Sequence, residues 1–297
     1  MVRKSKTVDR IAEARRMQSP CELCPRRCGA DRAKGEKGFC ALGTDARVAS
    51  AGPHFGEEPC LVGTGGSGAI FLAGCNLGCV FCQNEDLRQP EAGRAFDTAA
   101  LVQQMLALEA AGCENVNFVT PTPVAPALME AITEARKAGL TIPIVWNSSG
   151  YERVEVLRLL EGLVDIYMPD FKFSLSRTAG RYCRAPDYPA RASASLLEMH
   201  RQVGDLSVTG GVARRGLLVR HLVMPGAADE GREIMDFVAS ALPQTSVNVM
   251  GQYRPNGWLS HPPGSRDFAA IGHAPAAEEV AVVRDHARHL GLRLLDA

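Results

Sequence analysis

The sequence of 297 residues contains no run of about eighteen apolar residues, so we predict no transmembrane helix. Its charged first residues, 1–6, lead into no apolar segment, which argues against a signal peptide. There is no net charge, because 33 Lys and Arg balance 33 Asp and Glu, and this argues against nucleic acid as a partner. Aromatic residues are only 6 % of the chain, but 46 % of it is apolar and can form a sizeable core. These absences predict a folded protein of the cytoplasm without a membrane partner.

Cysteine, in contrast, is abundant, with ten residues in the chain. Because the cytoplasm disfavours disulfides, this number points to metal or redox chemistry. Five of the ten lie in the first 66 residues, among many glycines and with little helix or strand periodicity between residues 21 and 68. This part is also basic, with 12 Lys and Arg against 6 Asp and Glu in residues 1–50. We expect residues 1–66 to form a loop-rich module that is held together by something other than an apolar core.

Residues 67–297 alternate between apolar runs of strand length and amphipathic segments of helix length. The expected strands are 69–73, 116–120, 142–146, 165–168, 216–224 and 246–250. The expected helices are 98–111, 124–138, 151–163, 194–203, 230–242 and 276–290. This alternation predicts an α/β fold with a parallel sheet. Six units are too few for a closed eight-stranded barrel, so we predict an open partial (β/α)6 barrel, with a doubly wound sheet as the alternative. In both, the chemistry lies at the carboxyl ends of the strands.

Three cysteines lie in the loop directly after the first expected strand, in Cys75-Asn76-Leu77-Gly78-Cys79-Val80-Phe81-Cys82. Three thiolates on one loop can hold three irons of a cubane and leave the fourth iron open to a substrate or cofactor. Gly74 and Gly78 let the backbone turn tightly around the sulfur atoms. The alternatives are a zinc site completed by a distant ligand, and cysteines packed as small apolar residues in a core strand.

This C-x3-C-x-aromatic-C pattern resembles the radical S-adenosylmethionine (SAM) superfamily. More narrowly, the chain resembles the homologues of pyruvate formate-lyase activating enzyme, in residues 21–40, 54–59, 67–84, 117–123, 147–152, 165–172, 185–189 and 215–226. The resemblance implies a [4Fe-4S] cluster on Cys75, Cys79 and Cys82, with SAM chelated by the open iron. It also implies a one-electron donor such as flavodoxin or ferredoxin. The electron would cleave SAM to methionine and a 5′-deoxyadenosyl radical, which abstracts a hydrogen atom from a substrate.

Three kinds of function remain compatible with the sequence. The first is an activase that abstracts hydrogen from a backbone glycine of a partner enzyme, as the resemblance implies. The second is radical modification of another peptide or of a small molecule. The third is a non-catalytic iron–sulfur or zinc protein, against which the open three-cysteine pattern argues.

Polar residues at the ends of the second and third expected strands are candidates for binding SAM. Many radical SAM enzymes hold the SAM amino group with a Gly-Gly-Glu segment, and this chain has Thr120-Pro121-Thr122 there instead. Thr120 and Thr122 are therefore candidate partners of the amino group, with a plain turn as the alternative. Asn147 ends the third expected strand. By resemblance, Phe81 lies near the adenine.

The fourth and fifth expected strands end in charged residues. Asp170 and Lys172, two residues apart, point to the same side if extended, and they resemble the pair that holds SAM or a cation beside it. A surface ion pair is the alternative. By resemblance, Arg220 meets the SAM carboxylate. His221 alternates to the opposite face, as a core histidine or a site residue, and residues 252–254 are candidates for facing the substrate.

Four further thiols are candidate ligands of a second metal: Cys21, Cys24, Cys28 and Cys40. A metal would supply the folding free energy that this glycine-rich segment otherwise lacks. Zinc and a second iron–sulfur cluster both fit four cysteines, and unligated thiols in a loop are the alternative. Cys60 is a candidate replacement ligand, whereas the isolated Cys113 and Cys183 are expected to be structural.

Overall fold

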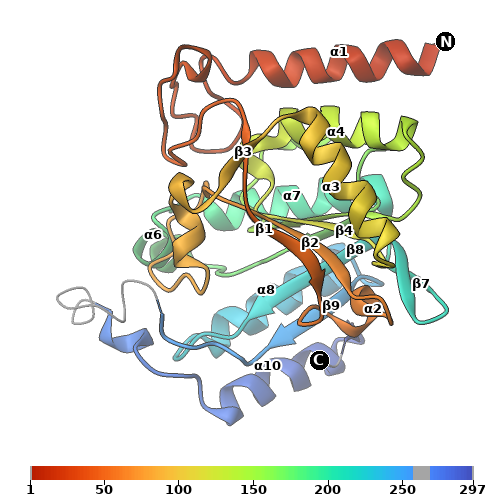
Figure 1. Ribbon diagram of the computed structural model, residues 1–297. Coiled ribbons are helices and arrows are strands. Elements are labelled where there is room, and N and C mark those ends of the chain that lie inside the picture. Colours follow the sequence, from red (N-terminus) through yellow and green to blue (C-terminus); the bar gives the residue numbers. More distant parts are fainter. Residues whose placement is uncertain (1, 257–267, 296–297) are drawn as a thin grey trace.

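A single mixed sheet runs through the computed structural model, which describes residues 2–256 and 268–295 (Figure 1). The strand order is β10-β9-β8-β6-β5-β4-β2-β1-β3, with β7 paired to β8. The strands are β1 (Ala46–His54), β2 (Ser67–Leu72), β3 (Arg94–Phe96), β4 (Val116–Val119), β5 (Ile144–Ser148), β6 (Ile166–Pro169), β7 (Ser207–Thr209), β8 (Val212–Leu222), β9 (Ser246–Met250) and β10 (Arg293–Leu294).

The central part of the sheet is parallel, from β2 through β4, β5, β6, β8 and β9 to β10. The first six of these strands overlap the six expected ones, because each is mostly apolar and largely buried. The sheet ends at β10 on one side and at β3 on the other, so it is open. The predicted open α/β architecture is confirmed.

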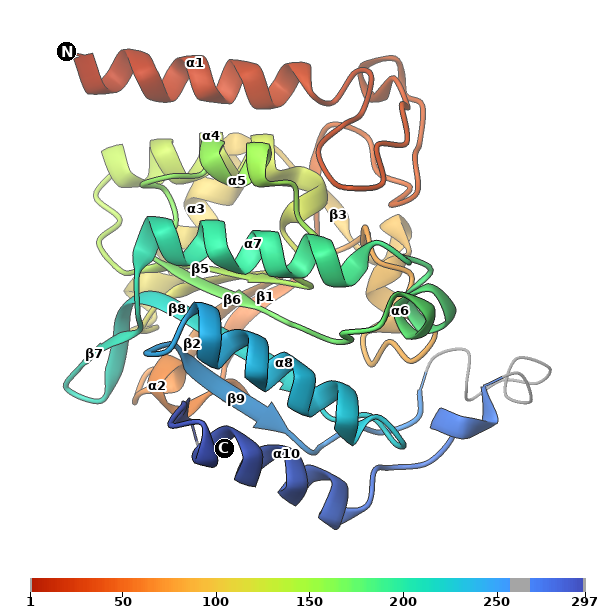
Figure 2. The same ribbon diagram turned by 180° about the vertical axis from the view of Figure 1, so that it is seen from behind.

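Most of the helices cover the outside of the sheet (Figure 2), whereas α2 lies on its inner side and α1 lies across other helices. The helices are α1 (Val2–Arg16), α2 (Pro59–Val62), α3 (Thr98–Ala110), α4 (Ala125–Lys137), α5 (Val154–Leu159), α6 (Ser176–Cys183), α7 (Tyr188–Val203), α8 (Ala228–Ala241) and α10 (Ala277–His289). Helices α3, α4, α8 and α10 lie where the periodicity predicts them, but α5 is shorter than residues 151–163 and α7 begins before residue 194. No helix in residues 2–256 and 268–295 is long and apolar enough to cross a bilayer.

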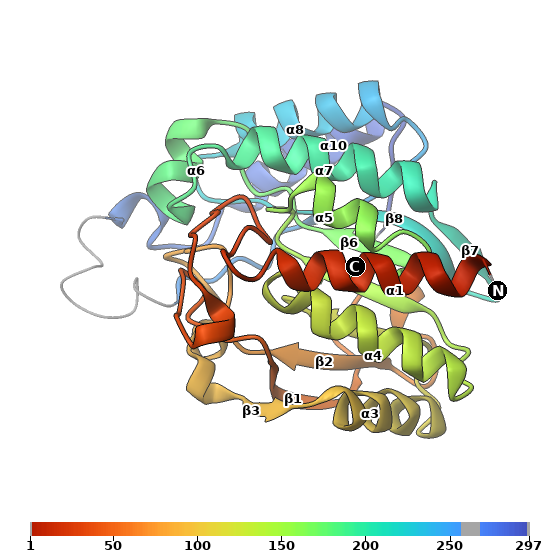
Figure 3. The same cartoon turned by 90° about the horizontal axis from the view of Figure 1, so that it is seen from above.

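The N-terminal residues are more ordered than the expected loop. Strand β1 pairs with both β2 and β3, in antiparallel orientation, and so belongs to the main sheet. Helix α1 lies across the outside of α4 and α5 (Figure 3). Leu23, Leu42 and Val48 join the large apolar core. The expectation that residues 1–66 are held together by something other than an apolar core is therefore wrong for these residues, because they pack into the core of the barrel. The boundary at residue 66 stays a prediction.

A second, smaller apolar cluster fills the inside of the curved sheet, where Leu61 of α2 packs with Val145, Ile166, Met168 and Leu218. Apart from Leu61, these residues come from β5, β6 and β8. Polar residues lie on the same face of β5 and β8, two positions further along: Asn147 after Val145, and Arg220 after Leu218. The cluster thus forms a floor inside the sheet. The polar side chains above it, at the carboxyl ends of the strands, face open space.

Candidate active site

A cavity of about 370 Å³ lies at the carboxyl ends of the parallel strands. Its lining includes ten residues that the sequence singles out: Cys75, Cys79, Phe81, Cys82, Thr120, Thr122, Asn147, Asp170, Lys172 and Arg220. They come from five segments spread over 146 positions of the chain, from 75 to 220. A parallel sheet brings the ends of all its strands to one edge, which explains why they meet.

Two residues, 73 and 74, separate β2 from the three-cysteine loop, residues 75–82. The backbone N–H of Leu77 donates to Cys75 Sγ at 3.4 Å, as expected of a loop that wraps its own sulfur atoms. Burial raises the pKa of Cys75 to about 12 and that of Cys82 to about 11, and the neighbouring Cys79 adds to both rises. The three thiols are therefore close together and protonated unless a cation joins them.

This donor set fits an iron–sulfur cluster, because three soft thiol ligands line one cavity and leave the rest of it open. Within the described ranges, no three His, Cys, Asp or Glu side chains form a site for a metal ion. A cubane is wider than one ion, so its ligands lie further apart than those of zinc. The assignment of iron to these cysteines rests on their pattern and shared cavity, not on preformed coordination geometry.

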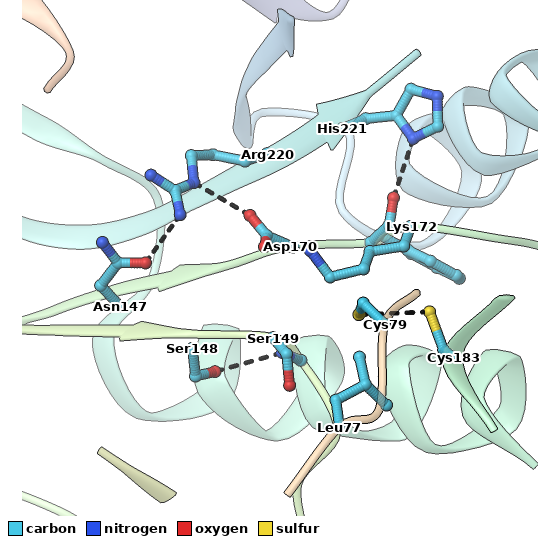
Figure 4. A network of polar contacts seen from close by, with 12 residues as sticks. Leu77, Cys79, Asn147, Ser148, Ser149, Asp170, Lys172, Cys183, Arg220 and His221 are labelled. Carbon is cyan, nitrogen blue, oxygen red and sulfur yellow. Dashed lines mark hydrogen bonds and ion pairs between the residues drawn. The ribbon is translucent and has the colours of Figure 1, made fainter. Parts of the chain in front are cut away.

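A charged network spans the ends of β5, β6 and β8 (Figure 4). Arg220 Nε donates to Asp170 Oδ1 at 3.0 Å, and Arg220 Nη2 donates to Asn147 Oδ1 at 2.7 Å. Lys172 Nζ donates to Asp170 Oδ2 at 2.6 Å. Burial opposes the charge on Asp170, but Lys172 and Arg220 outweigh it and hold the pKa of this carboxyl group below its ordinary value. The predicted same-side arrangement of Asp170 and Lys172 is confirmed, and their ion pair is largely buried.

The Thr-Pro-Thr segment is held in an unusual conformation. Thr120 has a φ of 63°, in the left-handed region that side chains rarely adopt. Thr122 Oγ1 donates to Glu152 Oε1 at 2.7 Å, and Trp146 Nε1 donates to the same oxygen at 3.2 Å. Burial raises the pKa of Glu152 to about 7, although these hydrogen bonds act against the rise. Glu152 therefore holds the Thr-Pro-Thr segment in place through Thr122. The sequence analysis missed this role because it expected Glu152 to lie in a helix.

Phe81, which belongs to the three-cysteine loop, is buried against two aromatic rings from outside the loop. It makes edge contacts with Phe173 and Tyr253, with ring centroids 5.9 and 6.0 Å apart. Of residues 252–254, only Gln252 lines the cavity; Tyr253 is buried beneath it and Arg254 is exposed. The aromatic packing fixes one wall of the cavity next to Cys82.

His221 lies on the other face of β8 from Arg220. Its Nδ1 hydrogen-bonds the Phe171 carbonyl oxygen at 2.8 Å, and burial lowers the pKa of its imidazole to about 4. His221 does not line the cavity. Of the two interpretations that the sequence left open, the core histidine is the one that this position supports.

Among the other residues that line the cavity are His54 and Glu57, which sequence reasoning missed. His54 ends β1, and Glu57 follows it and lies 3.4 Å from both His54 Nδ1 and Arg220 Nη1. Burial raises the pKa of Glu57, with the charge of Arg220 acting against the rise. A signal was available, because both belong to the similar stretch 54–59, but β1 was not expected to be a strand.

The four N-terminal cysteines are neighbours in space. Burial raises the pKa of Cys24 to about 12 and also raises that of Cys40, and Cys21 adds to both rises. Hydrogen bonds, including one with Cys21, lower the pKa of Cys28 against the effect of burial. The sequence prediction of a second metal site remains a prediction, since the thiols are grouped without metal-binding geometry in the part of the chain that is described.

Comparison with known proteins identifies the family. The family model for the radical SAM superfamily matches residues 69–238, which contain the three-cysteine loop and five of the six expected strands. The chain belongs to the radical SAM superfamily. As a radical SAM protein, it uses S-adenosylmethionine and a [4Fe-4S] cluster, the chemistry that the three-cysteine loop predicts.

The narrower relationships leave the substrate of this radical SAM protein open. The chain is 32 % identical over 255 residues to the uncharacterized protein MJ0674 of Methanocaldococcus jannaschii, covering 83 % of this chain and 69 % of that protein. Streptococcus suis SuiB bound to its precursor peptide SuiA is similar with 11 % identity, a TM-score of 0.49, and coverage of 74 % of this chain and 45 % of SuiB. The methyltransferase TsrM of Kitasatospora setae, with cobalamin and a [4Fe-4S] cluster bound, gives 17 % identity, a TM-score of 0.43 and coverages of 61 % and 36 %. The chain thus spans less than half the length of either solved structure.

Proposed function

We propose that this protein is an enzyme that reductively cleaves SAM and uses the resulting radical to abstract hydrogen from a substrate. One observation carries the proposal: the three cysteines and the Asp170–Lys172–Arg220 network line the same cavity. A non-catalytic metal protein has no need of buried charges beside an incomplete set of metal ligands, because burying them costs free energy. The charges are explained if a charged cofactor binds between them and the cysteines.

The residues divide the work of holding that cofactor. We assign Cys75, Cys79 and Cys82 to the [4Fe-4S] cluster, which supplies the electron that cleaves SAM to methionine and the 5′-deoxyadenosyl radical. Phe81 shields the cavity from water on the side of the adenine. Thr120 and Thr122 offer oxygen atoms to the SAM amino group, at the strand end where other members have Gly-Gly-Glu.

The carboxylate of SAM requires a positive partner, and two are present. Lys172 keeps its charge, since the neighbouring carboxylate of Asp170 raises its pKa against the effect of burial. Arg220 is fixed by three acceptors, on Asn147, Asp170 and Glu57. We assign the carboxylate to these two cations. Asp170 and Asn147 hold the two side chains in place, so they need to move little when SAM binds.

For the substrate we propose a backbone glycine of a partner enzyme, and for the electron donor a flavodoxin or ferredoxin in the cytoplasm. The support is the sequence resemblance to activating enzymes, above all Asp170-x-Lys172 and the Arg220 to Gly226 segment. Another peptide or a small molecule is the alternative substrate.

The test of SAM cleavage is anaerobic. We expect the protein, reconstituted with iron and sulfide and reduced with dithionite, to form 5′-deoxyadenosine from SAM. The Cys79→Ala variant should lose this product by at least ~100-fold, because a cluster ligand is missing. Cys113→Ala, at a buried cysteine outside the cavity, is the matched control. A reduced cluster whose electron paramagnetic resonance (EPR) signal is unchanged by SAM, with no product, would contradict the proposal.

The substrate is tested in the same samples. Glycyl-radical enzymes encoded near this protein's gene are added one at a time, and a glycine-centred EPR doublet is the expected signal. Product formation from SAM without a doublet in any mixture would favour another peptide or a small molecule.

A further inference from the structure

Cys183 is a fourth cysteine beside the three-cysteine loop, and the function above does not use it. It ends α6 and is 0 % exposed. Its Sγ lies 3.4 Å from Cys79 Sγ, a contact drawn in Figure 4. The sequence gives no reason to connect the two, since they are 104 residues apart.

The backbone holds the two cysteines opposite each other. The N–H of Gly78 donates to the Cys183 carbonyl oxygen at 3.1 Å, and the N–H of Val80 donates to the Tyr182 carbonyl oxygen at 2.9 Å. These two hydrogen bonds flank Cys79 on both sides. The contact between the sulfur atoms is therefore a consequence of how the loop is docked on α6, not of one side-chain rotamer alone.

Arg26 fastens the same junction from the N-terminal module. Its Nε donates to the Asn76 carbonyl oxygen at 2.9 Å and its Nη2 to the Cys183 carbonyl oxygen at 3.2 Å. One side chain thus links the three-cysteine loop to the end of α6. Four hydrogen bonds to the main-chain oxygen atoms of residues 76, 182 and 183, two of them from Arg26, therefore hold the loop that carries Cys79 against the end of α6 that carries Cys183.

The chemistry of the pair follows from which sulfur binds iron. A thiolate bound to iron has no proton and accepts hydrogen bonds, whereas Cys183 lies outside the C-x3-C-x2-C pattern and, as a thiol, has an S–H group to donate. Reduction adds negative charge to the cluster and its sulfur ligands, so a donor aimed at one of them stabilises the reduced form. We propose that Cys183 is a positioning residue that donates its S–H to Cys79 Sγ and thereby raises the reduction potential of the cluster. This rests on the proposed function, in that Cys79 must be a cluster ligand.

The test is an EPR-monitored redox titration of the reconstituted full-length protein without SAM. In Cys183→Ala we expect about a tenfold lower ratio of reduced to oxidised cluster at a given potential, which is about 59 mV for one electron. Cys183→Ser keeps a donor and should lie closer to the wild type than Cys183→Ala does. Cys113→Ala, which removes a cysteine that is 3 % exposed and outside the cavity, should titrate like the wild type.

Two results would overturn the proposal. One is a Cys183→Ala protein with the same iron content and the same potential as the wild type. The other is an equal shift in Cys183→Ala and Cys183→Ser, which would mean that the bulk of the sulfur matters and not its proton. Should Cys183→Ala lose its iron, Cys183→Val fills the space without a donor and is expected to show the same lowered potential.

The outcome is separable from that of the proposed function. A cluster that titrates with the expected shifts but never yields 5′-deoxyadenosine would contradict SAM cleavage and leave the role of Cys183 standing. An enzyme that forms 5′-deoxyadenosine but has the same cluster potential with and without the Cys183 thiol would support SAM cleavage and contradict the role of Cys183.

Discussion

Glu152 is the residue through which the two strand ends at β4 and β5 are tied together. It is 2 % exposed and accepts hydrogen bonds from Thr122 and Trp146. Burial disfavours the charged form of Glu152, and no cationic partner among the described residues compensates for it. Its pKa therefore rises from 4.5 to about 7. Ionisation of this one group therefore opposes folding at the pH values where radical SAM chemistry would be measured.

The sign of the pH effect follows from that direction. Because the pKa is higher in the folded state, the contribution of Glu152 to stability is complete below about pH 4.5 and is lost as the pH rises through 7. Glu152→Gln keeps the accepting oxygen and cannot ionise. Between pH 5 and pH 8.5 we expect the wild type to lose about 2–3 kcal/mol of unfolding free energy relative to this variant. Anaerobic urea unfolding at both pH values measures it.

The matched control is Glu278→Gln, at an exposed position at the start of α10. It should keep the pH dependence of the wild type. If Glu152→Gln also keeps it, the buried carboxyl group is not the source of the effect.

Among the elements, α2 has only four residues, yet it closes the floor of the site. Leu61 is 0 % exposed and packs with Val145, Ile166 and Leu218 inside the sheet. Leu61→Ala should cost about 2–5 kcal/mol of unfolding free energy, since it leaves a cavity in a core that cannot collapse easily. Leu197→Ala on α7, where the leucine is 46 % exposed, should cost less than about 0.5 kcal/mol. Both are measured by urea unfolding, and equal costs would mean that α2 does not belong to the core.

Elements differed in how far the sequence could predict them. Strands such as β4 and β6 were predictable because buried parallel strands are mostly apolar. Strand β1 was not, since only two of its nine residues are fully buried and its pairing with β2 and β3 comes from distant residues. Helix α1 was not predicted either, because about half of its residues are charged and no apolar stripe marks it in the sequence. Its position is set by packing on α4 and α5.

At the scale of the whole molecule, the two groups of cysteines are adjacent. A Cβ atom on Gly74 would lie 3.0 Å from the Cys40 carbonyl oxygen, so only glycine allows this close approach next to Cys75. Arg153, directly before α5, donates to the Glu22 carbonyl oxygen at 2.5 Å and so links the N-terminal residues to the barrel. The N-terminal module is therefore built against the active site.

We expect the full chain to bind metal at both groups of cysteines. Replacing Cys24 and Cys28 by serine should remove the second metal and leave the iron of the three-cysteine loop in place. Replacing Cys75, Cys79 and Cys82 by alanine should do the reverse. Mass spectrometry of iron and zinc per chain measures both, and it also identifies the N-terminal metal. An unchanged metal content in the Cys24→Ser, Cys28→Ser protein would contradict the second site.

The sequence by itself determined the open α/β architecture and the loop that carries the cluster ligands. It could do so because both depend on local order: apolar runs specify buried strands, and three cysteines on eight residues need no distant partner. It also placed Asp170 and Lys172 on one side, since alternate residues of an extended segment share a face. Only the tertiary structure decided what surrounds them. His54, Glu57, Glu152 and Cys183 reach the site through strand pairing and helix docking between residues far apart in the chain, and no local pattern encodes such contacts.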